Sequence, residues 1–279
     1  MDNNIKNDIH KNDITIVTAF YDLDRGNWKH FSRKTDYYFE CFERLCQLKN
    51  QIIVFSESKF KSKFDYIIEN IKSDLIVVYQ EKEDIFDREL IDRIKRTQEL
   101  KSDQEKTITV PEQWCPEYVY LTTLKTYFCC TAIESFSIVN DTKESFINDT
   151  VAWIDFGYVR KEKYLPESRL WKYAFRDKIH LWSVRNIPQR IDINEVIKTF
   201  KAYIMGGHII ASKNKWFYLK ESMNHQLEKL LSNSLIDDEQ TLLLMAYLEN
   251  KKEYVLYREI IDYSDLDWFF IFKYYNDCT

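Results

Sequence analysis

An acidic residue follows directly after one of the most apolar runs of the chain. Asp155 comes after the run VAWI, and Phe156 and Gly157 follow it. An acid placed directly after a buried strand lies at the rim of a sheet, facing the cleft in which open α/β proteins bind ligands. Mg²⁺ and Mn²⁺ prefer such carboxylate oxygens, and Gly157 would let a ligand approach the backbone closely. A structural turn that uses Asp and Gly explains the same residues, so both interpretations stay open.

A second candidate site lies at the end of the first apolar run, ITIVTAF. Thr18, Ala19, Phe20 and Tyr21 end this run, and Arg25 follows in a polar segment. An aromatic ring can stack on a base, backbone groups can bond its edge, and a guanidinium can pair with a phosphate through two hydrogen bonds. The same pattern also describes an ordinary strand-to-helix loop with surface charges.

These residues need a scaffold, and the apolar pattern predicts one of alternating strands and helices. Short β-branched runs predict strands, whereas apolar residues at helical spacing predict helices. Strand and helix alternate along residues 14–80, which indicates a parallel sheet with right-handed crossovers. The predicted strands are 14–20, 51–58, 74–80, 150–159 and 178–184; the predicted helices are 32–50, 64–72, 81–106, 117–136, 215–233 and 237–250; and 190–203 fits either.

The composition limits the domain organisation and the function. The chain has 279 residues but only 4 glycines and 4 prolines, so it cannot supply the glycine-rich phosphate loops of common nucleotide-binding folds. Its net charge of −5 argues against a nucleic-acid partner. Neither a membrane-spanning run nor a signal segment is apparent, so we expect a cytoplasmic protein. We predict a disordered tail over residues 1–13 and a single domain over 14–279.

Four segments resemble the HtrL/YibB (WlaTC-like) family of bacterial surface-polysaccharide proteins. They are TAFYDLDRGNW, WIDFGY, the Met-Gly-Gly segment before a Trp-containing helix, and DEQ. The resemblance covers most of the chain, roughly Ile14 to Trp268, and is more specific in the first two segments. It implies a GT-A-type glycosyltransferase fold, which is α/β with a mostly parallel central sheet flanked by helices. It also implies a nucleotide-sugar donor and a role in lipopolysaccharide, lipooligosaccharide or capsule assembly.

The resemblance leaves the use of a metal open. In GT-A enzymes, a strand that ends in Trp-hydrophobic-Asp-x-Asp supplies the acids that bind the metal. Asp155 matches the first acid, but Gly157 replaces the second. Either His208 completes a Mn²⁺ or Mg²⁺ site with Asp155, or cations stabilise the leaving group without a metal.

Arg25 and Lys125 are the candidates for such cations. Lys125 lies in an otherwise apolar helical pattern, where a charged group needs a partner. A position on the surface of the helix explains Lys125 equally well.

The acceptor side of the expected site involves two glycines and two acids. Gly206 and Gly207 resemble the segment that closes under the donor sugar, where the backbone can pack tightly against a saccharide. Asp238 and Glu239 begin a helix at the place where GT-A enzymes put an acid near the acceptor. In an inverting enzyme such an acid would deprotonate the acceptor hydroxyl, and in a retaining enzyme it would orient a substrate. Acids at a helix N-terminus also suit the helix dipole alone.

The resemblance therefore implies a hexosyltransferase that moves a hexose, with galactose or glucose favoured, from a UDP-sugar to a lipid-linked or oligosaccharide acceptor. Residues 14–160 would bind the nucleotide, and residues 161–279 would face the acceptor. The missing second acid motivates an alternative, a non-catalytic sugar-nucleotide or glycan-binding protein that regulates surface polysaccharide assembly. A nucleotidyltransferase is disfavoured, because that class opens with a glycine-rich basic loop. The aromatic cluster from Trp268 to Tyr275 either packs back on the domain or touches the inner membrane.

Overall fold

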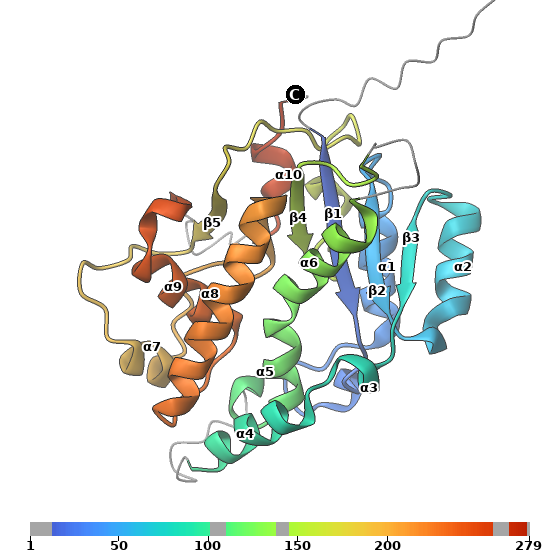
Figure 1. Cartoon of the computed structure of the whole chain (residues 1–279). Helices are drawn as coiled ribbons and strands as arrows, with labels where there is room; N and C mark the ends of the chain where they lie inside the picture. The colour runs from blue at the N-terminus through green and yellow to red at the C-terminus, as the bar shows by residue number, and fades with distance from the viewer. Residues whose placement is uncertain (1–12, 101–109, 138–144, 259–267, 278–279) are drawn as a thin grey trace, which may run out of the picture.

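The computed structural model describes residues 13–100, 110–137, 145–258 and 268–277. Within these ranges one seven-stranded sheet has the order β3-β2-β1-β4-β6-β5-β7 (Figure 1). Both halves of the chain contribute strands to it. The strands are β1 (Ile14–Phe20), β2 (Ile52–Ser56), β3 (Ile76–Tyr79), β4 (Thr150–Ile154), β5 (Ile179–Ser183), β6 (His208–Ser212) and β7 (Tyr254–Arg258).

The sheet is parallel except at β6. β1 pairs in parallel with β2 and β4, β2 with β3, and β5 with β7, whereas β6 pairs antiparallel with β4 and β5. β1 and β2 are buried along almost their whole length, as expected for continuous apolar runs in strands covered on both faces. The predicted α/β class with a mostly parallel central sheet flanked by helices is confirmed.

The reversed direction of β6 brings its first residues to the edge at which β4 ends. Ile154, the last residue of β4, is opposite His208, the first residue of β6. Just beyond this pair, the backbone N–H of Asp155 donates a hydrogen bond of 2.9 Å to the carbonyl of Gly207. The two glycines before β6 therefore lie beside the acid that follows β4.

Helices cover both faces of the sheet, each over its own apolar core. One core lies between the sheet and α4 to α9, and the other lies between the sheet and α1, α2 and α10 (Figure 1). The helices are α1 (Thr35–Leu45), α2 (Lys61–Asn70), α3 (Lys82–Ile85), α4 (Arg88–Glu99), α5 (Pro116–Thr123), α6 (Lys125–Phe136), α7 (Ile193–Thr199), α8 (Lys213–Ser232), α9 (Glu239–Glu249) and α10 (Ile271–Tyr274).

The single helix predicted over 117–136 is two helices, because the chain breaks at Leu124. The hydroxyl of Thr122 donates to the carbonyl of Val119, and that of Thr123 donates to the carbonyl of Tyr120. Such bonds from Ser and Thr side chains to an earlier carbonyl compete with the helical pattern and bend helices. The break makes Lys125 the first residue of α6.

Other predicted boundaries also change. The helix predicted over 32–50 is the shorter α1, and the charged segment predicted as one helix over 81–106 is α3 and α4, separated where the Asp87 side chain caps α4. The end of that segment, from residue 101, lies outside the described residues, as do residues 1–12 of the predicted tail. Residues 190–203 contain α7, and β6 and β7 were not predicted.

Part of the C-terminal aromatic segment packs on the domain. Phe270, Ile271 and Phe272 are buried in the second core, whereas the Tyr274 side chain is exposed. No helix in the described part of the chain combines the length and the apolar character needed to cross a bilayer.

Candidate functional site

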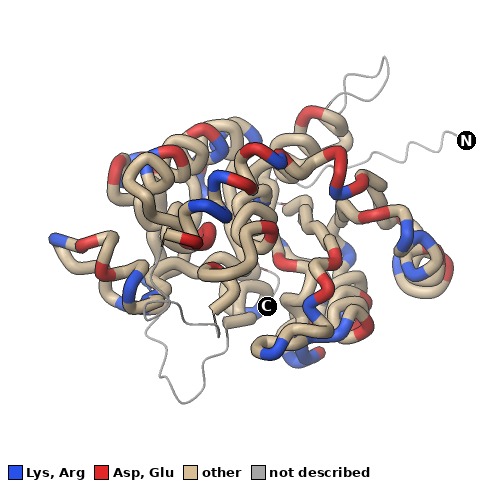
Figure 2. Tube along the Cα trace, turned by 90° about the horizontal axis from the view of Figure 1, so that it is seen from below, with Lys and Arg blue, Asp and Glu red and all other residues tan. Residues whose placement is uncertain are grey.

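A pocket of about 210 Å³ opens where β1 and β4 end. Its walls contain Ala19, Phe20 and Tyr21 from the end of β1, Lys125 from α6, and Asp155 and Gly157 after β4. Figure 2 views the molecule from this side and shows acidic and basic residues interspersed along the chain. The structure thus brings together, in one pocket, candidate site residues that were identified in separate segments of the sequence.

A second cavity of about 580 Å³ adjoins the first and shares Arg25, Asp155 and Glu239 with it. It extends to Gly206, Gly207 and Asp238, the residues predicted for the acceptor side. The aromatic side chains of Trp268 and Phe269 also line this cavity. A ligand with two parts could therefore reach from the end of β1 to the start of α9.

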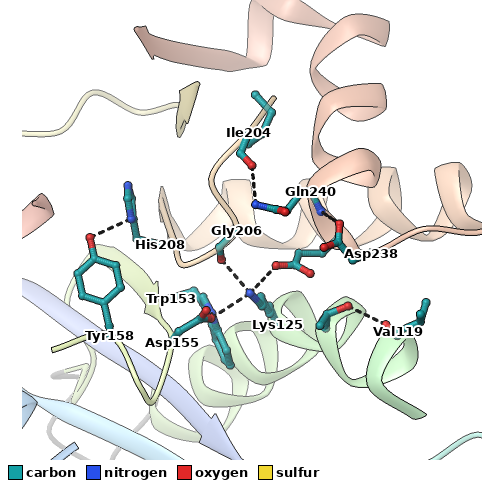
Figure 3. A network of polar contacts seen from close by, with 12 residues as sticks. Val119, Lys125, Trp153, Asp155, Tyr158, Ile204, Gly206, His208, Asp238 and Gln240 are labelled. Carbon is teal, nitrogen blue, oxygen red and sulfur yellow. Dashed lines mark hydrogen bonds and ion pairs between the residues drawn. The ribbon is translucent and has the colours of Figure 1, made fainter. Parts of the chain in front are cut away.

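Lys125 is the centre of the polar contacts between the two cavities. Its Nζ lies 2.6 Å from Glu239 Oε1, 2.9 Å from Asp155 Oδ1 and 2.8 Å from the carbonyl oxygen of Gly206 (Figure 3). Burial alone would lower the pKa of the Lys125 ammonium, but Asp155 and Glu239 outweigh it and raise that pKa overall. The side chain is only 7% exposed, and with this raised pKa it is charged.

An ammonium group has three N–H donors, and each has an acceptor here. Lys125 therefore holds two carboxylates and one backbone segment in fixed positions, and it has no further donor for a phosphate. This geometry suits a positioning residue better than the leaving-group cation considered from the sequence.

Asp155 keeps one side exposed to the pocket. Its Oδ1 accepts a hydrogen bond of 2.8 Å from Trp153 Nε1 in addition to the contact with Lys125. Its side chain is nevertheless 44% exposed. The carboxylate is thus oriented by the protein and accessible to a ligand.

Glycine is required at position 206 by the approach of Glu239. A Cβ built on Gly206 would overlap the Glu239 carboxylate, whereas one built on Gly207 would make an ordinary contact of 3.6 Å with Asp155 Oδ2. Neither glycine has a positive φ, so the requirement at Gly206 is one of space. At Gly157 the nearest atom to such a Cβ is on the Tyr38 ring, at 3.0 Å.

His208 lies outside both cavities. It is fully buried, its Nδ1 is 3.1 Å from the hydroxyl of Tyr158, and its ring packs against Trp182 and Phe270. Burial lowers its pKa to about 3, so the imidazole is neutral.

The Oδ1 of Asp155 faces the Lys125 ammonium, and the imidazole of His208 contacts Tyr158, Trp182 and Phe270. In the described residues no three His, Cys, Asp or Glu side chains form a group able to hold a metal. The use of Mn²⁺ or Mg²⁺ stays a prediction.

The predicted nucleotide loop is only partly accessible. Thr18 is fully buried and lines neither cavity. Phe20 stacks on Phe156 at 4.8 Å, and Tyr21 stacks on Phe128 at 5.7 Å, so the faces of both rings are already in contact with the core. Ala19, Phe20 and Tyr21 nevertheless line the smaller pocket.

Arg25 is positioned by a tight loop after β1. Asp24 adopts the left-handed conformation with φ 57°, and its N–H donates to Asp22 Oδ1, an arrangement that Asp tolerates well. Arg25 Nε donates to the carbonyl of Phe31 at 3.0 Å, and its guanidinium lies 5.2 Å from the centre of the Trp28 ring. Arg25 lines both cavities.

The acidic wall contains a residue that the sequence did not reveal. Glu112 lines the larger cavity with Asp238 and Glu239. Burial, reinforced by Asp237 and Glu239, raises the pKa of Glu112 to about 7. Burial and Glu239 also raise the pKa of Asp238, whose Oδ1 caps α9 by accepting from the Gln240 N–H. A carboxyl group with a pKa of about 7, as at Glu112, can exchange protons near neutral pH.

Two further residues missed by the sequence analysis are basic. Arg33 and Arg160 line both cavities together with Arg25. Nothing in the sequence separates them from the other residues of the 40 that are Lys or Arg. Only the folded chain brings the segment before α1 and the segment after β4 together.

This is an α/β protein with a charged two-part pocket at the carboxyl ends of its parallel strands. The chain belongs to the HtrL_YibB family, described as bacterial proteins of unknown function, whose model matches residues 12–277. The resemblance found in the four segments is thus confirmed. Protein HtrL of Escherichia coli is 29% identical over 249 residues, which cover 85% of each chain.

Two solved structures are similar at low identity. One is mouse xyloside xylosyltransferase 1 in its apo form, with 9% identity and a TM-score of 0.41 over 88% of this chain and 84% of that one. The other is 4-diphosphocytidyl-2C-methyl-D-erythritol synthase from Anaerococcus prevotii, with 9% identity and a TM-score of 0.37 over 89% of this chain and 87% of that one. Similarity at this level identifies no shared activity.

Proposed function

We propose that this protein is a glycosyltransferase that moves a hexose from a nucleotide-sugar donor to a glycan acceptor. UDP is the favoured nucleotide, and galactose or glucose the favoured sugar. The observation that carries the proposal is the two-part pocket at the ends of β1 and β4, with arginines and acids on its walls. Ligands of open α/β folds bind at such strand ends.

The donor fits the smaller pocket and its boundary with the larger one. Its nucleoside would lie over Ala19 and the end of β1, and its diphosphate would lie near Arg25 and Asp155. When the bond between the sugar C1 and the phosphate oxygen breaks, negative charge develops on the departing diphosphate. A guanidinium fixed nearby lowers the energy of that transition state.

The acceptor fits the larger cavity, where the acids lie. An acceptor hydroxyl that attacks C1 must lose a proton, and a carboxylate with a raised pKa accepts it more readily. Asp238 is the better candidate for this base, because the Glu239 carboxylate is buried and already bound to Lys125. Glu239 and Lys125 then act as positioning residues.

The family resemblance alone supports a role in the assembly of a bacterial surface polysaccharide. The acceptor would be a growing surface glycan, either an oligosaccharide or a lipid-linked chain at the inner membrane. Mn²⁺ or Mg²⁺ is the alternative means of neutralising the diphosphate, with Asp155 as one ligand.

Thermal-shift measurements with UDP, GDP, CMP and their sugars test the proposal. A nucleotide that binds the folded state raises the melting temperature by mass action. We expect UDP and a UDP-hexose to give the largest shifts, followed by slow release of UDP when the donor is incubated with the protein. No shift with any nucleotide would refute the transferase, whereas a shift without any turnover on glycan acceptors would favour the non-catalytic binding protein.

A further inference from the structure

We propose that Arg33 and Arg160, together with Arg25, form an anion site that binds the diphosphate of the donor. The inference rests on the proposed function for the identity of the ligand, but the anion site itself stands on geometry. All three side chains line both cavities, at the boundary where a diphosphate would join the nucleoside to the sugar.

The first observation is that Arg160 has an unmet hydrogen-bonding group. Its Nε is buried, and within the described ranges no acceptor lies in hydrogen-bonding distance of it. A buried donor without an acceptor is costly and uncommon in folded proteins. An oxyanion that enters the pocket would supply the missing acceptor.

The second observation is that neither Arg33 nor Arg160 forms an ion pair with an acid in the described part of the chain. Other arginines do: Arg93 binds Glu228 at 2.7 Å, and Arg44 lies 3.7 Å from Glu40. Arg160 instead faces uncharged aromatic groups, and its guanidinium lies 4.3 Å from the centre of the Phe269 ring. A guanidinium held over an aromatic ring in this way can still pair with two oxyanion oxygens through its N–H groups.

The third observation is mutual repulsion within the pair. Burial lowers the pKa of Arg160, and the positive charge of Arg33 lowers it further. Two like charges at one partly buried place destabilise the ligand-free protein. A ligand with two negative charges would remove this repulsion, which makes a diphosphate a better occupant than a neutral sugar.

The fourth observation concerns Lys125, the other cation of the pocket. All three of its donors already have protein acceptors. The arginines are therefore the cations of the described pocket that can neutralise a phosphate. Arginine also suits this role by chemistry, because its fork of N–H groups matches two phosphate oxygens.

The test is calorimetric titration of inorganic pyrophosphate, UDP and uridine into the full-length protein in the presence of EDTA. Arg33→Gln and Arg160→Gln are compared with Arg93→Gln, which removes a surface arginine that has its own acid. We expect pyrophosphate and UDP to bind about tenfold or more weakly to the first two variants and unchanged to the third. Binding of uridine should be insensitive to all three.

Arg33→Gln guards against a folding defect at Arg160, because in the described part of the chain Arg33 has no ring contact like that of Arg160 with Phe269. Melting temperatures of the variants identify any such defect. Pyrophosphate that fails to bind the wild type, or binds both variants as tightly as the wild type, overturns the anion site. If pyrophosphate binds and needs both arginines but no nucleotide binds, the anion site is supported and the nucleotide-sugar donor is refuted.

Discussion

Lys125 and Glu239 form a buried ion pair of 2.6 Å that joins the start of α6 to the start of α9. The same ammonium also binds Asp155 after β4, so three segments distant in the sequence meet at one nitrogen. A charge held in this way must be matched by its partners, because an unpaired buried charge is strongly destabilising. The pair thus links the formation of the pocket to the stability of the whole fold.

Lys125→Met should lower the free energy of unfolding by about 3 kcal/mol, because the substitution leaves the buried Glu239 carboxylate without its cation. Urea denaturation measures the loss. Lys61→Met is the matched control, since Lys61 pairs with Asp65 on the surface, where an ion pair contributes little, and it should leave stability essentially unchanged. Equal losses of unfolding free energy in the two variants would show that the buried ion pair contributes no more to stability than the surface pair.

Gly206→Ala should destabilise the protein by about 1–3 kcal/mol, because the added methyl group overlaps the Glu239 carboxylate. Gly207→Ala is its natural comparison. The backbone at Gly207 has no positive φ and its Cβ has room, so that variant should be neutral or slightly stabilising. Thermal denaturation of the two variants measures the difference. A higher melting temperature for Gly206→Ala than for Gly207→Ala would disprove the steric argument.

The raised pKa of Glu112 predicts a pH-dependent stability. A carboxyl group with a folded pKa of about 7 and an ordinary value near 4.5 binds its proton more tightly in the folded state. The stabilisation of the folded state by protonated Glu112 is therefore fully present below pH 4.5 and is lost as the pH rises through 7.

Glu112→Gln removes this contribution to the pH dependence. The difference in unfolding free energy between wild type and variant should shift by on the order of 2 kcal/mol from pH 5 to pH 8, in the direction of a weaker wild type. Urea denaturation across this range provides the measurement. His208 acts in the opposite sense at acidic pH, but it is common to both proteins and cancels in the difference. A constant difference at all pH values would contradict the raised pKa.

Asp238→Asn should reduce kcat on a working donor and acceptor pair by at least about 100-fold, because it removes the proposed base. Asn remains a good N-cap, so α9 should be retained. Asp192→Asn makes the same change at the cap of α7, where Asp192 accepts from the Asn194 N–H at 2.9 Å. Steady-state kinetics of both variants test the role, and full activity of Asp238→Asn would exclude it.

An excess of EDTA should change UDP binding less than about twofold, since guanidinium groups can neutralise the diphosphate without a metal. Titration calorimetry with and without EDTA, and again with added Mn²⁺, checks this. A tenfold loss in EDTA that Mn²⁺ restores would instead establish a metal site, and Asp155→Asn would then be expected to abolish it.

The parts of the fold that were predictable depend on local signals. The apolar runs that form β1 and β4 are continuous, so their ends, with Tyr21 and Asp155, could be placed at the pocket from the sequence. β6 could not be predicted in the same way, because its apolar residues carry no signal for strand direction and its antiparallel pairing with β4 and β5 is decided by tertiary contacts. β7 (Tyr254–Arg258) was also not predicted, since its pairing with β5 depends on tertiary contacts as well.

The site was predictable where a residue broke a local pattern, and not elsewhere. Lys125 is a charged residue in an apolar helix, so the sequence could single it out as a candidate site residue. Its contacts with Gly206 and Glu239 could not be predicted, because they depend on segments distant in the sequence. Arg33 and Arg160 break no pattern, because charged residues are ordinary in polar loops. Their convergence is a product of chain topology, which a single sequence does not encode locally.

The reversed strand β6 has a consequence for how this pocket can change. In a wholly parallel sheet, the loops that enter strands lie at the opposite edge from the ligand. Here the connection from α7 into β6 arrives at the edge where the pocket lies, through Gly206 and Gly207. A substitution at Gly207 therefore changes the pocket wall directly while the register of the seven strands is left in place, whereas Gly206 is fixed by the approach of Glu239.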